Sequence, residues 1–188
     1  MALYRLYRGQ AFPLLVALWL MRSSEISAAD FGLRPQALPS FVAIFLVATL
    51  AGILIDQNGY ALLSGLPGYA QLGGMPPKAD PVLDWLDLTF GLLMVGVFEE
   101  LVFRGYLCTF LQRYTRSSLA IVLISAAAFG LIHWGLGLHA VLVTAIIGAL
   151  FMVAYLRTRS LPAIMLAHFA INFVDFSGVI PKSIFKFL

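Results

Sequence analysis

Long apolar runs, each bounded by charged residues, proline or glycine, dominate this chain. A run of about 20 apolar residues is long enough to cross the hydrocarbon core of a bilayer as a helix. The pattern therefore predicts an all-α protein, a polytopic membrane bundle of about six transmembrane helices. The predicted spans lie near residues 10–22, 39–56, 86–111, 118–136, 138–156 and 160–177.

The first apolar run has two interpretations. It follows Arg5 and Arg8 and precedes the small residues Ser27-Ala28-Ala29, which is also the pattern of a secretory signal peptide. However, Arg22 and Glu25 are unusual so close to a cleavage site. We therefore expect an uncleaved first span.

The stretch from Asp56 to Asp84 differs from the rest of the chain. It contains Asn-Gly, Gly-Gly and Pro-Pro pairs, which are turn signals. We predict a long loop here, with at most a short interfacial helix over residues 60–63. Because the sequence has no internal repeat and no low-complexity tail, residues 1–188 are predicted to form a single membrane-embedded domain.

Composition supports a membrane protein. The chain is 61% hydrophobic and 11% charged, and its mean hydropathy is +0.94. A soluble domain is about half apolar and about a quarter charged. The net charge of +3 does not indicate a nucleic-acid partner, because Lys and Arg stand at the ends of apolar runs instead of forming one patch. The single cysteine, Cys108, lies in an apolar run, where we expect a packed thiol.

The distribution of arginines orients the last four spans. Arg113 and Arg116 lie between the third and fourth spans, and Arg157 and Arg159 lie between the fifth and sixth. The intervening loop near residues 136–138 has neither Lys nor Arg. The positive-inside rule therefore places both arginine pairs in the cytoplasm. The orientation of the first two spans stays open. Counting back through six spans would place the N-terminal arginines outside the cell, against the same rule.

Three charged residues lie near the middle of the third predicted span. A charge at the centre of a spanning helix costs about 2.5–3.5 kcal/mol on insertion scales, so such residues face the bundle interior and mark functional sites. Glu100 and Arg104 are four residues apart and can pair on one helical face. Glu99 is turned by about 100° from Glu100. We expect Glu99 to remain unpaired and to be available as a general base.

Two later spans carry further polar residues. His133 ends an apolar run in the fourth span, and His168 and Asn172 share one face of the sixth. An imidazole can transfer protons, and both side-chain types can donate hydrogen bonds. Water activated by Glu99, with donors for the developing oxyanion, is sufficient to hydrolyse an amide. The set predicts an intramembrane endopeptidase.

Each feature also has a structural interpretation. A Glu–Arg pair often only joins helices, a histidine at a helix end is often only a hydrogen-bonded polar residue, and His168 with Asn172 could clasp two helices. Two other functions remain: a non-catalytic immunity or peptide-binding membrane protein, and a small transporter with Glu99 and His133 on a proton path. The presence of all the polar sets in one small protein favours the enzyme. His139 is interpreted as a bystander at the membrane surface and Asp175 as a helix-end charge near solvent.

Three short motifs lie in this order in successive spans. They are Glu99-Glu100-x-x-x-Arg104, Phe129-x-x-x-His133 and His168-x-x-x-Asn172. They resemble the motifs of the CAAX prenyl protease and bacteriocin-processing family, also called the ABI or CPBP family of glutamic intramembrane proteases. The resemblance covers about residues 86–177. The stretch Phe31-Gly32-Leu33-Arg34 also resembles a common feature of that family.

The resemblance implies a role for each residue. Glu99 would activate the water with help from His133, His168 and Asn172 would form the oxyanion hole, and Glu100 with Arg104 would support the site. It implies no cofactor and no required metal. The residues themselves leave zinc open, since two histidines and a carboxylate can bind it, and only the lack of a His-Glu-x-x-His arrangement argues against it.

The resemblance also implies the surroundings of the protein. Its partners would be membrane lipid and a membrane-bound peptide or protein substrate. The chain is shorter than the eukaryotic prenyl-protein enzymes and looks more like compact bacterial members, which process peptide precursors or the C-terminal sorting signals of exported proteins. We therefore expect a multi-pass protein of a bacterial inner membrane, with a site that is reached from the side opposite the arginines.

Overall fold

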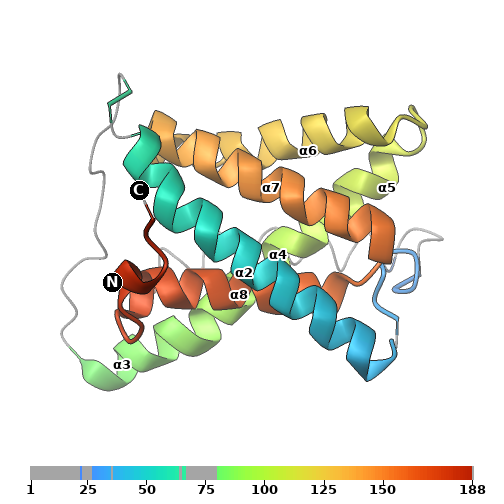
Figure 1. Cartoon of the computed structure of the whole chain (residues 1–188). Helices are drawn as coiled ribbons and strands as arrows, with labels where there is room; N and C mark the ends of the chain where they lie inside the picture. The colour runs from blue at the N-terminus through green and yellow to red at the C-terminus, as the bar shows by residue number, and fades with distance from the viewer. Residues whose placement is uncertain (1–21, 23–26, 35, 64, 67–79, 188) are drawn as a thin grey trace.

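The computed structural model describes residues 22, 27–34, 36–63, 65–66 and 80–187. In this part of the chain every regular element is a helix (Figure 1). The prediction of an all-α fold is confirmed for these residues. The first predicted span, near 10–22, lies outside them except for its last residue.

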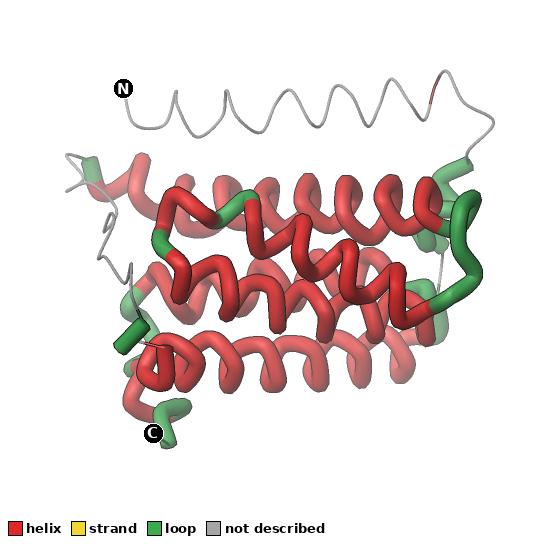
Figure 2. The backbone as a smooth tube through the Cα atoms, turned by 90° about the horizontal axis from the view of Figure 1, so that it is seen from above, coloured by secondary structure: helices red, strands yellow, loops and turns green. Residues whose placement is uncertain are grey.

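The helices follow one another closely along the chain. In order they are α2 (Leu38–Leu63), α3 (Pro81–Leu86), η1 (Asp87–Gly91), α4 (Leu92–Glu100), η2 (Leu101–Leu107), α5 (Cys108–Leu111), α6 (Ser118–Leu131), η3 (Trp134–Leu136), α7 (Leu138–Thr158), α8 (Leu161–Ser177) and η4 (Lys182–Ile184). Helices α6 and α7 pack together, α2 packs on both α7 and α8, and α4 packs on α8. Seen from above, the long helices lie roughly side by side (Figure 2).

The predicted third span is one long helix with two unusual segments. Asp80 caps its start, because the carboxylate oxygen accepts the backbone N–H of Val82 at 2.8 Å, and Pro81 occupies the first turn. The segments η1 and η2 are π-helical. Such wide turns are rare and are frequently found at functional sites. η2 begins directly after Glu100, in the middle of the charged set.

The predicted loop is wrong for its first residues. Helix α2 continues past Asp56 to Leu63, so Asn58-Gly59 is not a turn. A Cβ at Gly59 would lie 2.8 Å from Cγ2 of Val143, and this glycine therefore lets α2 approach α7 closely. The small residue serves helix packing here, which its dipeptide context does not reveal. The stretch 60–63 is the end of α2 and not a separate helix.

Helix length agrees only in part with the predicted spans. By length and apolar composition, two of the described helices, α2 and α7, can each cross a membrane, and α6 and α8 are shorter apolar helices. The 21 residues of α7 rise about 32 Å, close to the thickness of a hydrocarbon core. The number of about six spans stays a prediction.

The core and the outer surface are both apolar. Side chains from α2, α7 and α8 form one cluster, joined by Phe31 from the turn before α2 and by the fully buried Cys108. The packed thiol is as predicted. Apolar side chains are also more than half exposed on the outward faces of several helices: Leu46, Leu50, Leu123 and Ile146. An apolar outer surface is what a lipid environment accepts.

Candidate active site

The predicted ion pair between Glu100 and Arg104 is present and fully buried. Nη1 of Arg104 donates to Oε1 of Glu100 at 2.9 Å, and both side chains are 0% exposed. Nη2 of Arg104 donates to the carbonyl of Gly148 on α7 at 3.1 Å. A buried pair needs such further hydrogen bonds to offset its desolvation. The pair therefore also ties the third helix to α7.

His168 shares the same carboxylate. Its Nδ1 lies 2.8 Å from Oε1 of Glu100. An ionised carboxylate paired with arginine can only accept, so Nδ1 of His168 must carry the proton. This contact fixes the ring orientation and leaves Nε2 as the free edge of the imidazole. The sequence did not predict it, because Glu100 and His168 are 68 residues apart.

Glu99 faces the other edge of the same imidazole. Oε2 of Glu99 lies 3.8 Å from Nε2 of His168, too far for a direct hydrogen bond. That oxygen is buried and has no hydrogen-bond partner among the described residues. The Glu99 side chain as a whole is 23% exposed, whereas that of Glu100 is fully enclosed. The two adjacent glutamates therefore have different surroundings, as predicted from their 100° separation.

Phe129 connects the two predicted histidines. Its ring centroid lies 5.2 Å from that of His133 and 5.9 Å from that of His168. The guanidinium carbon of Arg104 lies 4.5 Å from the same centroid, within the range of a cation–π contact. Gly148 lets the Phe129 ring lie close to α7, since a Cβ at this position would be 3.1 Å from the ring. His133 thus joins the site through Phe129.

His133 follows the end of α6. Its Nδ1 lies 2.9 Å from the carbonyl of Phe129, which α6 leaves without an intrahelical partner at its last turn. A carbonyl only accepts, so Nδ1 of His133 donates and Nε2 is left as an acceptor. The interpretation of His133 as a helix-capping residue and its catalytic interpretation are compatible, because the cap fixes the tautomer that a proton acceptor needs.

Asn172 lies one turn beyond His168 on α8 and is half-buried. Within the described part of the chain its amide makes no hydrogen bond, so the structure does not show the helix clasp that was considered for His168 and Asn172. The structure brings Glu99, Glu100, Arg104 and His168 into direct contact. No hydrogen bond within the described residues joins Asn172 to either glutamate.

A glycine sets the distance between the two helices that carry the site. A Cβ at Gly96 on α4 would lie 2.9 Å from the carbonyl of Met165 on α8. The two backbones therefore approach closely one turn before Glu100. Sequence reasoning passed over this residue, although a small residue within an apolar run is a known signal of close helix crossing.

The structure shows the surroundings of two remaining polar residues. His139 is only 7% exposed, so its side chain is buried within the protein. Asp175 is half-buried and accepts a hydrogen bond of 3.4 Å from Nε2 of Gln57. Gln57 also donates to its neighbour Asp56, and both are buried on α2. The sequence analysis had assigned these α2 residues to a loop.

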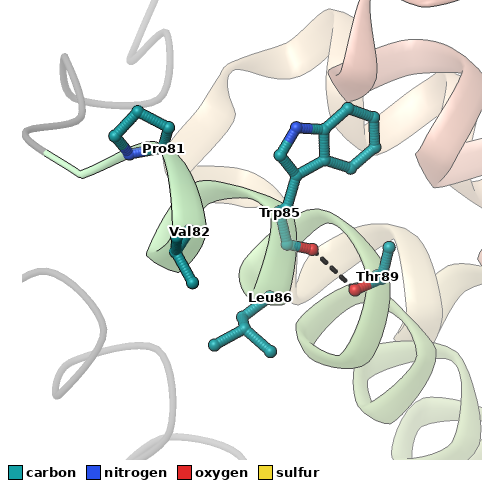
Figure 3. Close-up of a pocket in the computed structure, with 5 residues that line it drawn as sticks. All are labelled: Pro81, Val82, Trp85, Leu86 and Thr89. Carbon is teal, nitrogen blue, oxygen red and sulfur yellow. Dashed lines mark hydrogen bonds between the residues drawn. The ribbon is translucent and has the colours of Figure 1, made fainter.

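A separate pocket at the start of the third helix is lined by no acidic, basic or histidine side chain of the described residues. It measures about 340 Å³. Its lining residues are Pro81, Val82, Trp85, Leu86 and Thr89 (Figure 3). The hydroxyl of Thr89 donates to the carbonyl of Trp85 at 2.6 Å. With regard to metals, no group of three or more His, Cys, Asp or Glu side chains within the described residues is placed to hold an ion.

The comparison with protein families agrees with this geometry. The model of a family described as type II CAAX prenyl endopeptidase Rce1-like matches residues 81–174, half of the chain. The chain belongs to this family. The matched region runs from α3 to α8 and contains all six predicted site residues. The resemblance seen in the motifs is thereby confirmed, and the chain is a membrane protein of a protease family. No curated protein and no solved structure matches the chain.

Proposed function

We propose that this chain is an intramembrane endopeptidase that hydrolyses a peptide bond of a membrane-associated substrate with a water activated by Glu99. One observation carries the proposal: Oε1 of Glu100 is shared by Arg104 and His168, so Glu99 is the carboxylate of the set without a cation in hydrogen-bond contact. A general base needs a carboxylate whose oxygens are free to accept a proton.

Charge balance assigns the protonation of the site. Glu99 and Glu100 bring two negative charges, and Arg104 brings one positive charge. We propose that His168 carries both ring protons in the reacting state, because an unbalanced charge in an apolar interior is costly. The imidazolium then donates from Nδ1 to Glu100, and its Nε2–H is left for a substrate oxygen. The base and an oxyanion donor are thus present together.

The chemical step follows from this arrangement. Glu99 takes a proton from water as the water oxygen attacks the substrate carbonyl carbon. The carbonyl oxygen becomes an oxyanion that accepts hydrogen bonds from Nε2–H of His168 and from the Asn172 amide. When the tetrahedral intermediate collapses, the carbon–nitrogen bond breaks and Glu99 returns its proton to the leaving amine. His133, with its free Nε2, accepts a hydrogen bond from the attacking water and orients it.

The membrane arrangement is part of the proposal. The third helix, α6, α7 and α8 cross the bilayer together with α2 and the run near 10–22, giving about six spans. The exposed apolar faces of these helices and the membership of a membrane protease family support it. The substrate is a peptide precursor or a C-terminal sorting signal of an exported protein, and the chain serves a bacterial inner membrane.

The test compares Glu99→Gln with the wild-type chain in proteoliposomes. The probes are a fluorogenic peptide with a farnesylated C-terminal cysteine motif and a membrane-anchored peptide without the lipid. We expect wild-type cleavage of at least one probe, complete loss with Glu99→Gln, and full activity after treatment with EDTA. Binding of both probes without cleavage would favour the non-catalytic alternative. Undiminished cleavage by the Glu99→Gln protein would refute the role of this carboxylate.

A further inference from the structure

A compact turn before α2 lies outside the residues that the family model matches. Residues 27–34 fold on themselves through backbone hydrogen bonds from Gly32 to Ala29 and from Leu33 to Ala28, each of 3.1 Å. Nε of Arg34 donates to the carbonyl of Ala29 at 3.0 Å. The turn contains the stretch Phe31-Gly32-Leu33-Arg34, to which the proposed chemistry gives no role.

The turn is fixed on the end of the bundle that carries the arginines. Gly32 has φ +76, and a Cβ there would lie 2.5 Å from the carbonyl of Arg159 at the end of α7. Both facts require glycine. The carbonyl of Gly32 accepts the backbone N–H of Leu161, and Nε2 of Gln36 donates to the carbonyl of Thr158. The turn is therefore held at the junction of α7 and α8.

Phe31 reaches from this turn into the third helix. Its side chain is 2% exposed, and its Cδ1 lies 2.9 Å from the place that a Cβ on Gly105 would occupy. Gly105 belongs to the π-helical segment η2 and follows Arg104 directly. The phenylalanine ring thus fills the space beside the turn from which the guanidinium reaches Glu100.

The π-helical turn needs such a contact. A π-helical turn is rare, and unusual backbone geometry persists only where the surroundings hold it. The carbonyl of Gly105 accepts the backbone N–H of Cys108 and, at 2.7 Å, the hydroxyl of Thr109. Relaxation of η2 to a regular helix would rotate Arg104 relative to Glu100, because one residue fewer would fill the turn.

We propose that Phe31 is a positioning residue: packed against Gly105, it holds the π-helical turn η2 and thereby aims Arg104 at Glu100. The inference rests on the proposed endopeptidase function for its kinetic consequence, but not for its structural one. Phe31 packs against Gly105 of the third helix, so it acts through that helix.

A mutation series separates positioning from simple core packing. Phe31→Leu replaces the ring with a smaller side chain and so reduces the packing against Gly105. Gly105→Ala places a methyl group against the Phe31 ring. In the double variant, the methyl group added at position 105 takes up part of the space that the smaller side chain at position 31 leaves. Leu33→Ala is the matched control. Leu33 belongs to the same turn and packs on the core, but the atoms nearest to the Cβ position of Gly105 are those of Phe31.

Cleavage kinetics and amide hydrogen exchange are measured for each variant below its unfolding temperature. We expect Phe31→Leu and Gly105→Ala each to lower kcat about tenfold to a hundredfold at nearly unchanged KM, since small displacements of aligned groups act on the chemical step. The double variant should recover kcat relative to Gly105→Ala, which is the sign of direct coupling. Amide hydrogen exchange over residues 101–109 should become faster with Phe31→Leu but not with Leu33→Ala.

The outcomes are distinguishable. Equal loss of stability with Phe31→Leu and Leu33→Ala, with kcat and exchange over 101–109 unchanged, would show that Phe31 only fills the core. If the wild-type chain cleaves neither probe, the endopeptidase proposal fails, and the exchange measurement still decides whether Phe31 holds η2. Faster exchange with unchanged kcat in an active protein would overturn the positioning role.

Discussion

His168 and Glu100 are joined by a hydrogen bond of 2.8 Å between Nδ1 and Oε1, although they lie on helices 68 residues apart in the chain. The same carboxylate oxygen accepts from Arg104 at 2.9 Å. Glu100 is therefore more than a partner for one arginine, because it also fixes the direction of the imidazole that faces Glu99. The two adjacent glutamates therefore differ, because one oxygen of Glu100 holds both the arginine and the histidine.

Glu100→Gln should destabilise the protein far more than Glu99→Gln. The substitution leaves Arg104 buried without its counter-charge, and breaking a buried pair costs about 3–5 kcal/mol. Glu99→Gln leaves that pair intact and should cost little stability while abolishing cleavage. Reversible unfolding in mixed micelles measures both. Equal stability of the two variants would contradict the division of labour between the carboxylates.

Phe129→Leu should lower activity without removing any polar group. Leucine keeps the apolar volume but loses the ring face beneath Arg104, a desolvated cation–π contact worth about 2 kcal/mol. Both histidines also lose their shared packing surface. We expect a fall in kcat of at least about tenfold. Phe129→Tyr retains the aromatic face and serves as the control; kinetics of Phe129→Leu that match the wild type would rule out this role.

Gly96→Ala should weaken the contact between α4 and α8. The new methyl group would meet the carbonyl of Met165 at 2.9 Å, and a backbone atom cannot turn aside as a flexible side chain can. Overpacking of this kind costs about 1–3 kcal/mol. Gly135→Ala is the matched control, because a Cβ there meets nothing within 4 Å. Thermal unfolding of the two variants should differ; similar midpoints would argue against a tight crossing at Gly96.

The turn that carries Phe31 should weaken in acid. Hydrogen bonds from the Ser27 hydroxyl and backbone N–H hold the pKa of Asp30 below its ordinary value of 3.8, and Arg34 and Arg159 act in the same direction. Since the folded-state pKa is lowered, this stabilisation is fully present above pH 3.8 and is lost as pH falls through the folded-state value.

The variant Asp30→Asn tests the predicted acid sensitivity, because it removes the charge of the side chain. The stability difference between the variant and the wild type should be constant near neutral pH and should shrink as pH falls below about 4. Amide exchange of residues 27–34 measures it locally. A difference that does not depend on pH would mean that the Ser27 contact is not linked to the charge of Asp30.

Much of the bundle follows from the chain itself. Apolar runs require lipid or a core, and their ends at charges, proline and glycine agree within a few residues with α6, α7 and α8. The pairing of Glu100 with Arg104 was predictable, since helical periodicity alone puts residues four apart on one face. The end of α2 was not predictable, because Asn58-Gly59 signals a turn locally while Gly59 serves the packing of α2 on α7.

The sequence by itself determined that Glu99, Glu100, Arg104 and His168 lie in apolar helices, the order of the motifs, and the family to which the chain belongs. Only the tertiary structure decided which of these residues meet. Periodicity relates positions within one helix, whereas the contacts of His168 with Glu100 and of Phe129 with both histidines depend on how separate helices cross. Those crossings are set by the glycines at 96 and 148, whose missing side chains let backbones approach, and such a distance is a property of two helices together.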